Sequence, residues 1–331
     1  MFSMKHSGLG SQLINLFVNQ IYLKQVYGYT TMLVDCVVYE GYQRPDGEPV
    51  LTGYFTPDLA IFNYQHEKAY VEPLLPTGFD FDTWENQLDF VQRAKSKFKK
   101  LVKHHAGDLV MVNHMMFHTE ARNWAKTDFG GYKALYRALV PSMCPHLQFK
   151  ETIRQEMREL RHRLYPTLPD DLHRTKSVAF HVRRTDKLIS EAQAYPSSAY
   201  VDQVVQILEL EGTPLQEMEI CFLATDDSTV HLEMQQALTA AGLSCRLVYT
   251  PPMDKFDSVN AGDTTIRYST DAGFVFLTEF SVMLETNYFV GTFGSNVGAL
   301  AAILRGCPGG YDYKNHFAHT YGVDRPHWYF R

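Results

Sequence analysis

A short stretch of the sequence that begins at His181 carries five side chains able to do chemistry: His181, Arg183, Arg184, Asp186 and Lys187. Two adjacent guanidinium groups cannot both face the same way. We therefore expect one to hold a phosphate bidentately while the other pairs with a carboxylate such as Asp186. The alternative is a solvated basic turn, because many charge runs are inert surface features.

A pair of carboxylates, Asp226 and Asp227, forms a second candidate. They follow an apolar run and precede Ser228, and any of these three residues could cap the helix expected next. Capping accounts for one carboxylate but not obviously for both. A spare carboxylate could accept hydrogen bonds from the amide and amino groups of a purine, or hold a ribose hydroxyl. Taken alone, the pair indicates helix capping at least as much as ligand binding.

Two glycine-rich turns form a third candidate. Segment 291–296 places Ser295 at the start of a helix, where exposed backbone N–H groups favour an anion. The turn at 8–11, which contains Gly10 and Ser11, makes the same arrangement in the first half of the chain. Together the two turns would line opposite sides of a cleft between domains, which suits a diphosphate.

Several functional classes are excluded or disfavoured. His114 and His118 have the spacing of a zinc pair but no intervening Glu and no obvious third ligand, so structural histidines are favoured and no metal site is expected. The sequence contains no nucleophile elbow, Walker loop or dinucleotide fingerprint. The net charge of −6 argues against a nucleic-acid binder. The five scattered cysteines do not settle the redox compartment.

The elements that must position these residues are clearest in the second half. Strands rich enough in apolar residues for burial on both faces are expected at 177–182, 219–224, 244–249 and 288–290. Helices are expected at 198–210, 228–241, 273–286 and 296–304. This alternation predicts a doubly wound α/β sheet, whose ligands bind outside the carboxyl ends of the strands. The candidate residues lie at those ends.

The first half predicts a further α/β unit. Helices are expected from the turn at 8–12 to residue 26 and at 84–103, 132–140 and 149–165, with strands at 31–37 and 108–113. The proline-containing stretch 165–170 reads as a connection. Because 331 residues exceed the usual size of one domain, we expect an N-terminal domain over 1–170 and a C-terminal domain over 171–331.

The segment from Phe180 to Lys187, together with Glu191, resembles the first motif of the α1,6-fucosyltransferases. Segment 222–227 is similar to their second motif, and 267–297 to their third. The resemblance implies a GT-B fold of two facing Rossmann-like α/β domains, with GDP-fucose held mainly by the second. It also implies inversion at the anomeric carbon without a metal or other cofactor. A shorter version of the first motif occurs in α1,2- and protein O-fucosyltransferases.

The resemblance implies a role for each donor-site residue. Arg183 becomes the leading diphosphate contact and Arg184 a supporting one, while His181 and Asp226 would recognise the guanosine. The phosphate pocket would be completed by residues of the two glycine-rich turns: Ser295, Asn296, Gly10 and Ser11.

The resemblance also implies the catalytic groups. Glu191 would deprotonate the acceptor hydroxyl, Lys187 would tune or relay that proton, and Arg183 would supply positive charge where the β-phosphate departs.

The implied acceptor is a glycan or glycoprotein, with an α1,6 linkage on an N-glycan core favoured. An α1,2- or protein O-fucosyltransferase is the alternative, and an inactive nucleotide-sugar binding protein is the alternative of another class. Gly294 and Asn296 depart from the usual Ser and Gln of the third motif. We expect no membrane anchor, stem or SH3-like domain in this chain. The resemblance favours the Golgi and secretory pathway, with the cytoplasm as the alternative.

Overall fold

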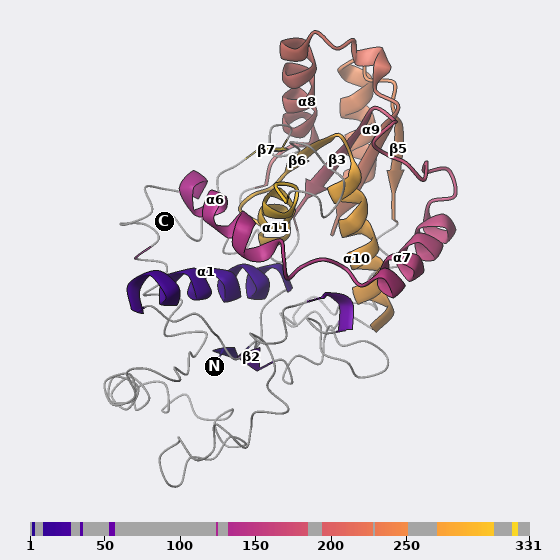
Figure 1. Ribbon diagram of the computed structural model, residues 1–331. Helices are drawn as coiled ribbons and strands as arrows, with labels where there is room; N and C mark the ends of the chain where they lie inside the picture. Colours follow the sequence, from indigo (N-terminus) through magenta and orange to yellow (C-terminus); the bar gives the residue numbers. More distant parts are fainter. Residues whose placement is uncertain are drawn as a thin grey trace.

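A five-stranded parallel sheet with strand order β5-β4-β3-β6-β7 is the main feature of the computed structural model (Figure 1). Its strands are β3 (Ser177–Val182), β4 (Ile220–Thr225), β5 (Arg246–Tyr249), β6 (Tyr288–Gly291) and β7 (Thr320–Gly322). The structure describes residues 2–3, 9–27, 34–35, 53–56, 124, 132–184, 194–227, 229–250, 270–307 and 320–323.

The central strand β3 shows why this sheet is covered on both faces. All six of its residues are buried. Successive side chains of a strand point to opposite faces. Val178, Phe180 and Val182 pack in one hydrophobic cluster, whereas Ala179 packs in the other. A strand with apolar side chains on both faces needs a helical layer on each side.

Helices supply both layers. On one face, α8 (Ser197–Glu211) and α9 (Val230–Ala240) pack against β3, β4 and β6. On the other lie α10 (Thr270–Glu285) and α11 (Asn296–Leu304) (Figure 1). The chain runs outward from β3 through β4 and β5, then returns through α10 to β6 on the other side of β3. The predicted doubly wound α/β class is therefore confirmed for this part of the chain.

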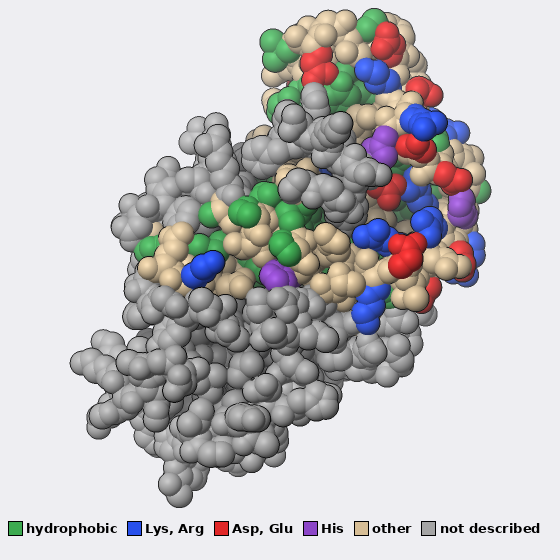
Figure 2. All heavy atoms as spheres, in the orientation of Figure 1, with side chains coloured by type: hydrophobic (Ala, Val, Ile, Leu, Met, Phe, Trp, Pro, Cys, Tyr) green, Lys and Arg blue, Asp and Glu red, His purple; other side chains and the backbone are tan. Residues whose placement is uncertain are grey.

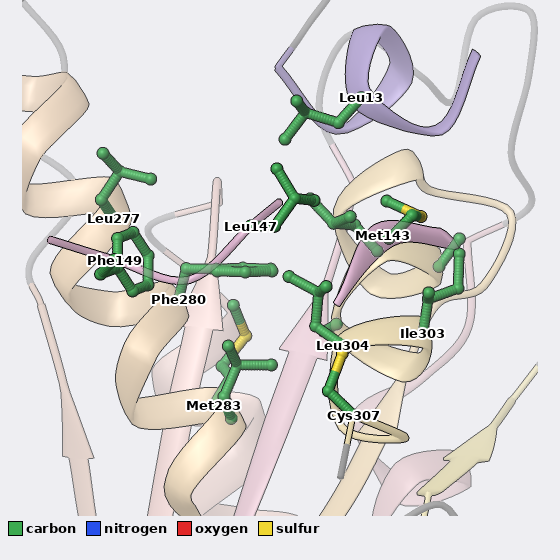
Figure 3. Packing of buried hydrophobic residues seen from close by; sticks show 14 of the residues in the cluster. Leu13, Met143, Leu147, Phe149, Leu277, Phe280, Met283, Ile303, Leu304 and Cys307 are labelled. Atoms are coloured by element: carbon green, nitrogen blue, oxygen red, sulfur yellow. The ribbon is translucent and has the colours of Figure 1, made fainter. Parts of the chain in front are cut away.

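Three helices from the first half pack on the α10 and α11 side: α1 (Leu9–Tyr27), α6 (Tyr132–Met143) and α7 (Glu151–Leu164). Figure 3 shows Leu13 of α1 pointing toward Leu147, with Leu304 of α11 and Phe280 of α10 in the same cluster. Helices on both sides of residue 170 thus share one core. The domain boundary at 170 and a second facing Rossmann-like domain stay predictions.

The described helices and strands are of the kinds that the sequence predicts, and they differ from the prediction mainly in the residues at which they begin and end. The strand at 177–182 and the helix at 296–304 have the predicted bounds. The strand expected at 31–37 is the short β2 (Val34–Asp35), which pairs with β1 (Phe2–Ser3). The sequence did not predict β1 or β7. The helix expected at 84–103 and the strand at 108–113 lie outside the described residues.

Two disulfides join described cysteines. Cys144–Cys307 links the residue after α6 to the chain just beyond α11, and Cys221–Cys245 links β4 to the residue before β5. The spacing of the cysteines did not predict either bridge, because pairs 163 and 24 residues apart carry no local signature. Each bridge stabilises the fold by limiting the conformations of the unfolded chain.

Side-chain contacts hold the predicted connection at 165–170 against α10. Arg161 of α7 forms an ion pair with Glu285 and donates to the carbonyl oxygen of Pro169 at 2.5 Å. The buried hydroxyl of Tyr165 hydrogen bonds with Thr250 and lies 3.3 Å from Glu279. Burial raises the pKa of Tyr165, so the phenol stays neutral.

Charges on the exposed side of α7 are mixed in sign. Figure 2 shows basic and acidic side chains interspersed there, and Arg158 contacts Glu151 at 3.1 Å. A similar pair joins Arg174 and Asp171 at 3.0 Å. This face has no single-sign patch of the kind that nucleic acids require. In the described part of the chain, no helix has the length and apolar character needed to cross a bilayer.

Candidate functional site

The candidate site lies at the carboxyl ends of β3, β4 and β6. His181 pairs in register with Gly291, so the ends of β3 and β6 are neighbours in the sheet. The chain leaves β3 in one direction and comes back to β6 in the other, which makes this the topological switch point. Doubly wound sheets bind ligands at that point. The arginines after β3, Asp226 after β4 and the glycine-rich turn after β6 surround it.

Asp226 holds the turn that follows β3. One of its carboxylate oxygens pairs with the guanidinium of Arg183 at 2.9 Å, and the other accepts the backbone N–H of Arg184 at 2.9 Å. The Asp226 side chain is only 6% exposed, so the ion pair lies in a partly dehydrated environment where it is strong. The orientation of Arg183 is therefore fixed from a neighbouring strand.

Arg184 points instead to α9. Its terminal nitrogens donate to both carboxylate oxygens of Glu233 at 2.8 and 2.7 Å, and one also donates to the carbonyl oxygen of Tyr195 at 3.0 Å. The hydrogen bonds that Arg184 donates to Glu233 raise the pKa of Arg184, so it stays charged. Both arginines thus pair with carboxylates, Arg183 with Asp226 and Arg184 with Glu233, and the expected phosphate contact of one of them stays a prediction. The carboxylate facing Arg184 is Glu233, whereas Asp186 lies outside the described residues.

The two adjacent aspartates have different partners. Asp227 accepts hydrogen bonds from the N–H and hydroxyl of Thr229 at 2.8 and 2.7 Å, just before α9 begins. Asp227 therefore holds the turn that leads into α9, whose N-cap residue is Thr229. Asp226 is the spare carboxylate, and it contacts the arginine turn. Its expected role in guanosine recognition stays a prediction.

A hydrogen-bond chain joins His181 to the glycine-rich turn. The N–H and hydroxyl of Thr292 donate to the His181 carbonyl oxygen at 3.1 and 3.2 Å. Because the Thr292 hydroxyl donates its hydrogen to that carbonyl, it acts as the acceptor toward Tyr200. The Tyr200 hydroxyl therefore donates to the Thr292 oxygen, at 2.5 Å. A Cβ on Gly298 would lie 3.1 Å from Nδ1 of His181, so the first turn of α11 packs directly on the imidazole.

The two glycine-rich turns meet. A Cβ on Gly10 would lie 2.9 Å from the carbonyl oxygen of Asn296, so the start of α1 touches the start of α11. Ser295 is the N-cap of α11, yet its hydroxyl makes no capping hydrogen bond. Oδ1 of Asn296 is buried without a hydrogen-bond partner in the described part of the molecule. Ser11 follows Gly10 in α1, and its side chain lies outside the described residues.

Lys187 and Glu191, the predicted relay and base, also lie outside the described residues. Where side chains are described, no group of three or more His, Cys, Asp or Glu could hold a metal ion. Sequence reasoning did not find Tyr200, Thr292 or Glu233. Their contacts depend on strands and helices distant in sequence, and no local pattern marks them.

Residues 180–184 of the first predicted motif, the second motif and residues 291–297 of the third lie at this site, and all three motifs fall in the segment that a family model matches. That model describes the N- and catalytic domains of α-(1,6)-fucosyltransferases, and it matches residues 148–318, just over half of the 331-residue chain. The chain belongs to the α-(1,6)-fucosyltransferase family. It is accordingly a fucosyltransferase, an enzyme of the glycosyltransferase class.

Solved structures similar to this fucosyltransferase include NodZ α-1,6-fucosyltransferase co-crystallised with GDP, with 14% identity and a TM-score of 0.45 over 92% of this chain and 91% of that one. POFUT1 in complex with GDP has 11% sequence identity and a TM-score of 0.48, over 97% of this chain and 96% of that one. An Arabidopsis thaliana FUT1 mutant in complex with GDP has 11% sequence identity and a TM-score of 0.47, over 92% of this chain and 68% of that one. No curated protein matches the sequence. Membership rests on the family model.

Proposed function

We propose that this enzyme transfers fucose from GDP-fucose to a hydroxyl of a glycan, with inversion at the anomeric carbon and without a metal. An α1,6 linkage to an N-glycan core-like acceptor is the favoured product. The observation that carries the donor assignment is Arg183 at the switch point, oriented by Asp226, at the same edge of the sheet from which the chain enters α11 at Ser295.

Arg183 suits a diphosphate for a chemical reason. A guanidinium has five N–H donors in a planar fork, so it can hold a carboxylate on one edge and a phosphate on another. The start of α11 adds backbone N–H groups and the positive end of a helix dipole. Because the hydroxyl of Ser295 does not cap its own helix, it suits a phosphate oxygen.

The reaction then proceeds as a single displacement. The acceptor oxygen forms a bond to C1 of fucose while the bond from C1 to the β-phosphate oxygen breaks, and GDP leaves with the electron pair. Glu191 takes the proton of the acceptor hydroxyl, and Lys187 tunes or relays that proton. Arg183 stabilises the negative charge that develops on the leaving phosphate, the task that metal ions perform in other transferases.

The proposed compartment is oxidising. The bridges Cys144–Cys307 and Cys221–Cys245 support it, because stable disulfides are rare where glutathione keeps thiols reduced. This favours the secretory pathway over the cytoplasm.

The test is incubation of the purified enzyme with GDP-fucose and a panel of glycans and peptides, following GDP release, product mass and the anomeric configuration of the product. Arg183→Ala is expected to weaken GDP binding about tenfold or more. Arg174→Ala is the matched control, since it removes the same charge from a side chain that is 89% exposed. Unchanged GDP binding by Arg183→Ala would overturn the donor assignment.

Glu191→Gln separates binding from chemistry. It is expected to keep GDP affinity and to reduce turnover roughly 100-fold or more, because a carboxamide cannot accept the proton. Full activity in this variant would show that another group is the base. Modification of peptides alone would favour a protein O-fucosyltransferase, and GDP binding without any product would favour an inactive binding protein.

A further inference from the structure

Glu233 of α9 forms an ion pair with the turn after β3. It accepts parallel hydrogen bonds from Arg184 at 2.8 and 2.7 Å, the bidentate geometry in which a guanidinium and a carboxylate bind most strongly. The same carboxylate accepts the hydroxyl of Ser197 at 3.4 Å. Arg184 also donates to the carbonyl oxygen of Tyr195. Glu233 and Arg184 therefore join the end of β3 to the starts of α8 and α9.

The pair is asymmetric in its burial. The Arg184 side chain is 12% exposed and that of Glu233 is 44% exposed. The arginine is thus the partner that depends on the contact, because loss of the carboxylate would leave a largely buried cation whose one acceptor among the described residues is the carbonyl oxygen of Tyr195. A buried charge without its counter-ion forces the surrounding chain to move.

That movement would reach the donor site through Asp226. Asp226 accepts the backbone N–H of Arg184 with one oxygen and holds the Arg183 guanidinium with the other, each at 2.9 Å. The turn is therefore fixed twice, by Glu233 through a side chain and by Asp226 through the backbone. Displacement of Arg184 would disturb the carboxylate that orients Arg183.

We propose that Glu233 is a positioning residue of the donor site, which acts through Arg184 to hold Arg183 ready for the diphosphate. The inference rests on the proposed function, because it takes Arg183 as the phosphate contact. Arg184 then serves to place its neighbour rather than to touch the donor. An arginine held in advance loses less conformational freedom on binding, so donor affinity is the property that Glu233 controls.

The experiment is a double-mutant cycle on GDP affinity, measured calorimetrically with the full chain, together with kcat and the KM for GDP-fucose. Glu233→Ala is expected to weaken GDP binding about tenfold and to raise the KM by a similar factor, with a smaller loss of kcat. In an Arg184→Ala background, Glu233→Ala should not weaken GDP binding further, because Glu233 acts on Arg183 through the Arg184 side chain that this background lacks.

Two further variants make the result unambiguous. Glu209→Ala removes an exposed carboxylate from the neighbouring α8 and should bind GDP like the wild type. Glu233→Gln keeps the shape of the side chain and serves if Glu233→Ala does not fold. It should weaken GDP binding about threefold, because the amide oxygen still accepts one hydrogen bond from Arg184 but the amide nitrogen cannot accept the other.

Wild-type affinity in a folded Glu233 variant, or equal losses in the wild-type and Arg184→Ala backgrounds, would overturn the positioning role. A wild-type enzyme that fails to bind GDP would instead overturn the proposed function, and this inference with it.

Discussion

Gly298 is the position where a single methyl group should disturb the site most. It lies in the first turn of α11, and an added Cβ would stand 2.3 Å from the carbonyl oxygen of Thr292 and 3.1 Å from Nδ1 of His181. Alanine would otherwise stabilise the helix by about 1 kcal/mol relative to glycine. The contact with a backbone oxygen cannot be relieved by a side-chain rotation, so we take the upper end of overpacking costs, about 3 kcal/mol.

Gly298→Ala is therefore expected to destabilise the enzyme by about 2 kcal/mol, which lowers the melting temperature by about 4–8 °C. GDP affinity should fall roughly tenfold, because both obstacles belong to the site and small displacements there are costly. Differential scanning fluorimetry and calorimetry measure the two effects.

The matched control is Gly242→Ala. Gly242 has a φ of +74° and no atom within 4 Å of an added Cβ, so alanine there costs about 1–2 kcal/mol from backbone strain alone. This control should melt earlier but bind GDP normally. If Gly298→Ala melts and binds GDP like the wild type, the packing of α11 on His181 is not what holds the site together.

Three other perturbations have defined outcomes. Cys144→Ser should lower the free energy of unfolding by about 2–4 kcal/mol in a denaturant titration, and an unchanged midpoint would argue against the bridge. Hydrogen bonds from Arg184 lower the pKa of Glu233 from 4.5. The stability that this pair contributes is thus fully present above pH 4.5 and is lost as the pH falls through the lowered pKa. The stability difference between wild type and Glu233→Gln should accordingly shrink in acid, whereas a constant difference down to about pH 3 would contradict the pairing. Tyr200→Phe should destabilise the enzyme by about 1–2 kcal/mol in thermal unfolding, because Thr292 loses a buried donor, and a wild-type melting temperature would contradict this.

The sequence predicted helices and strands correctly where the local residue pattern and the burial of the residues agree. The run from Ser177 to Val182 is mostly apolar, and only a strand covered on both faces buries every residue of such a run. The helix at 296–304 is apolar and begins directly after a glycine-rich turn. The sequence therefore indicated both that a helix forms there and where it begins. The positions of Arg183 and Asp226 at strand ends followed from these elements.

Contacts that depend on tertiary structure were beyond the sequence. Nothing near Glu233 marks it as the partner of Arg184, which is 49 residues away. The partner expected for this arginine turn was the adjacent Asp186, because proximity in sequence is the only guide when the fold is unknown. The meeting of Gly10 with Asn296 was anticipated only as two turns facing a common ligand, whereas the structure brings their backbones into contact.

The packing of α1 against α11 also concerns how the chain reaches its native state. During synthesis α1 leaves the ribosome well before α11, one of the helices that pack on it. The part of its apolar surface that faces α11 therefore stays uncovered until α11 has been made. Contacts so distant in sequence slow folding and prolong exposure to aggregation. The nascent enzyme is thus a natural client for chaperones until α11 has left the ribosome.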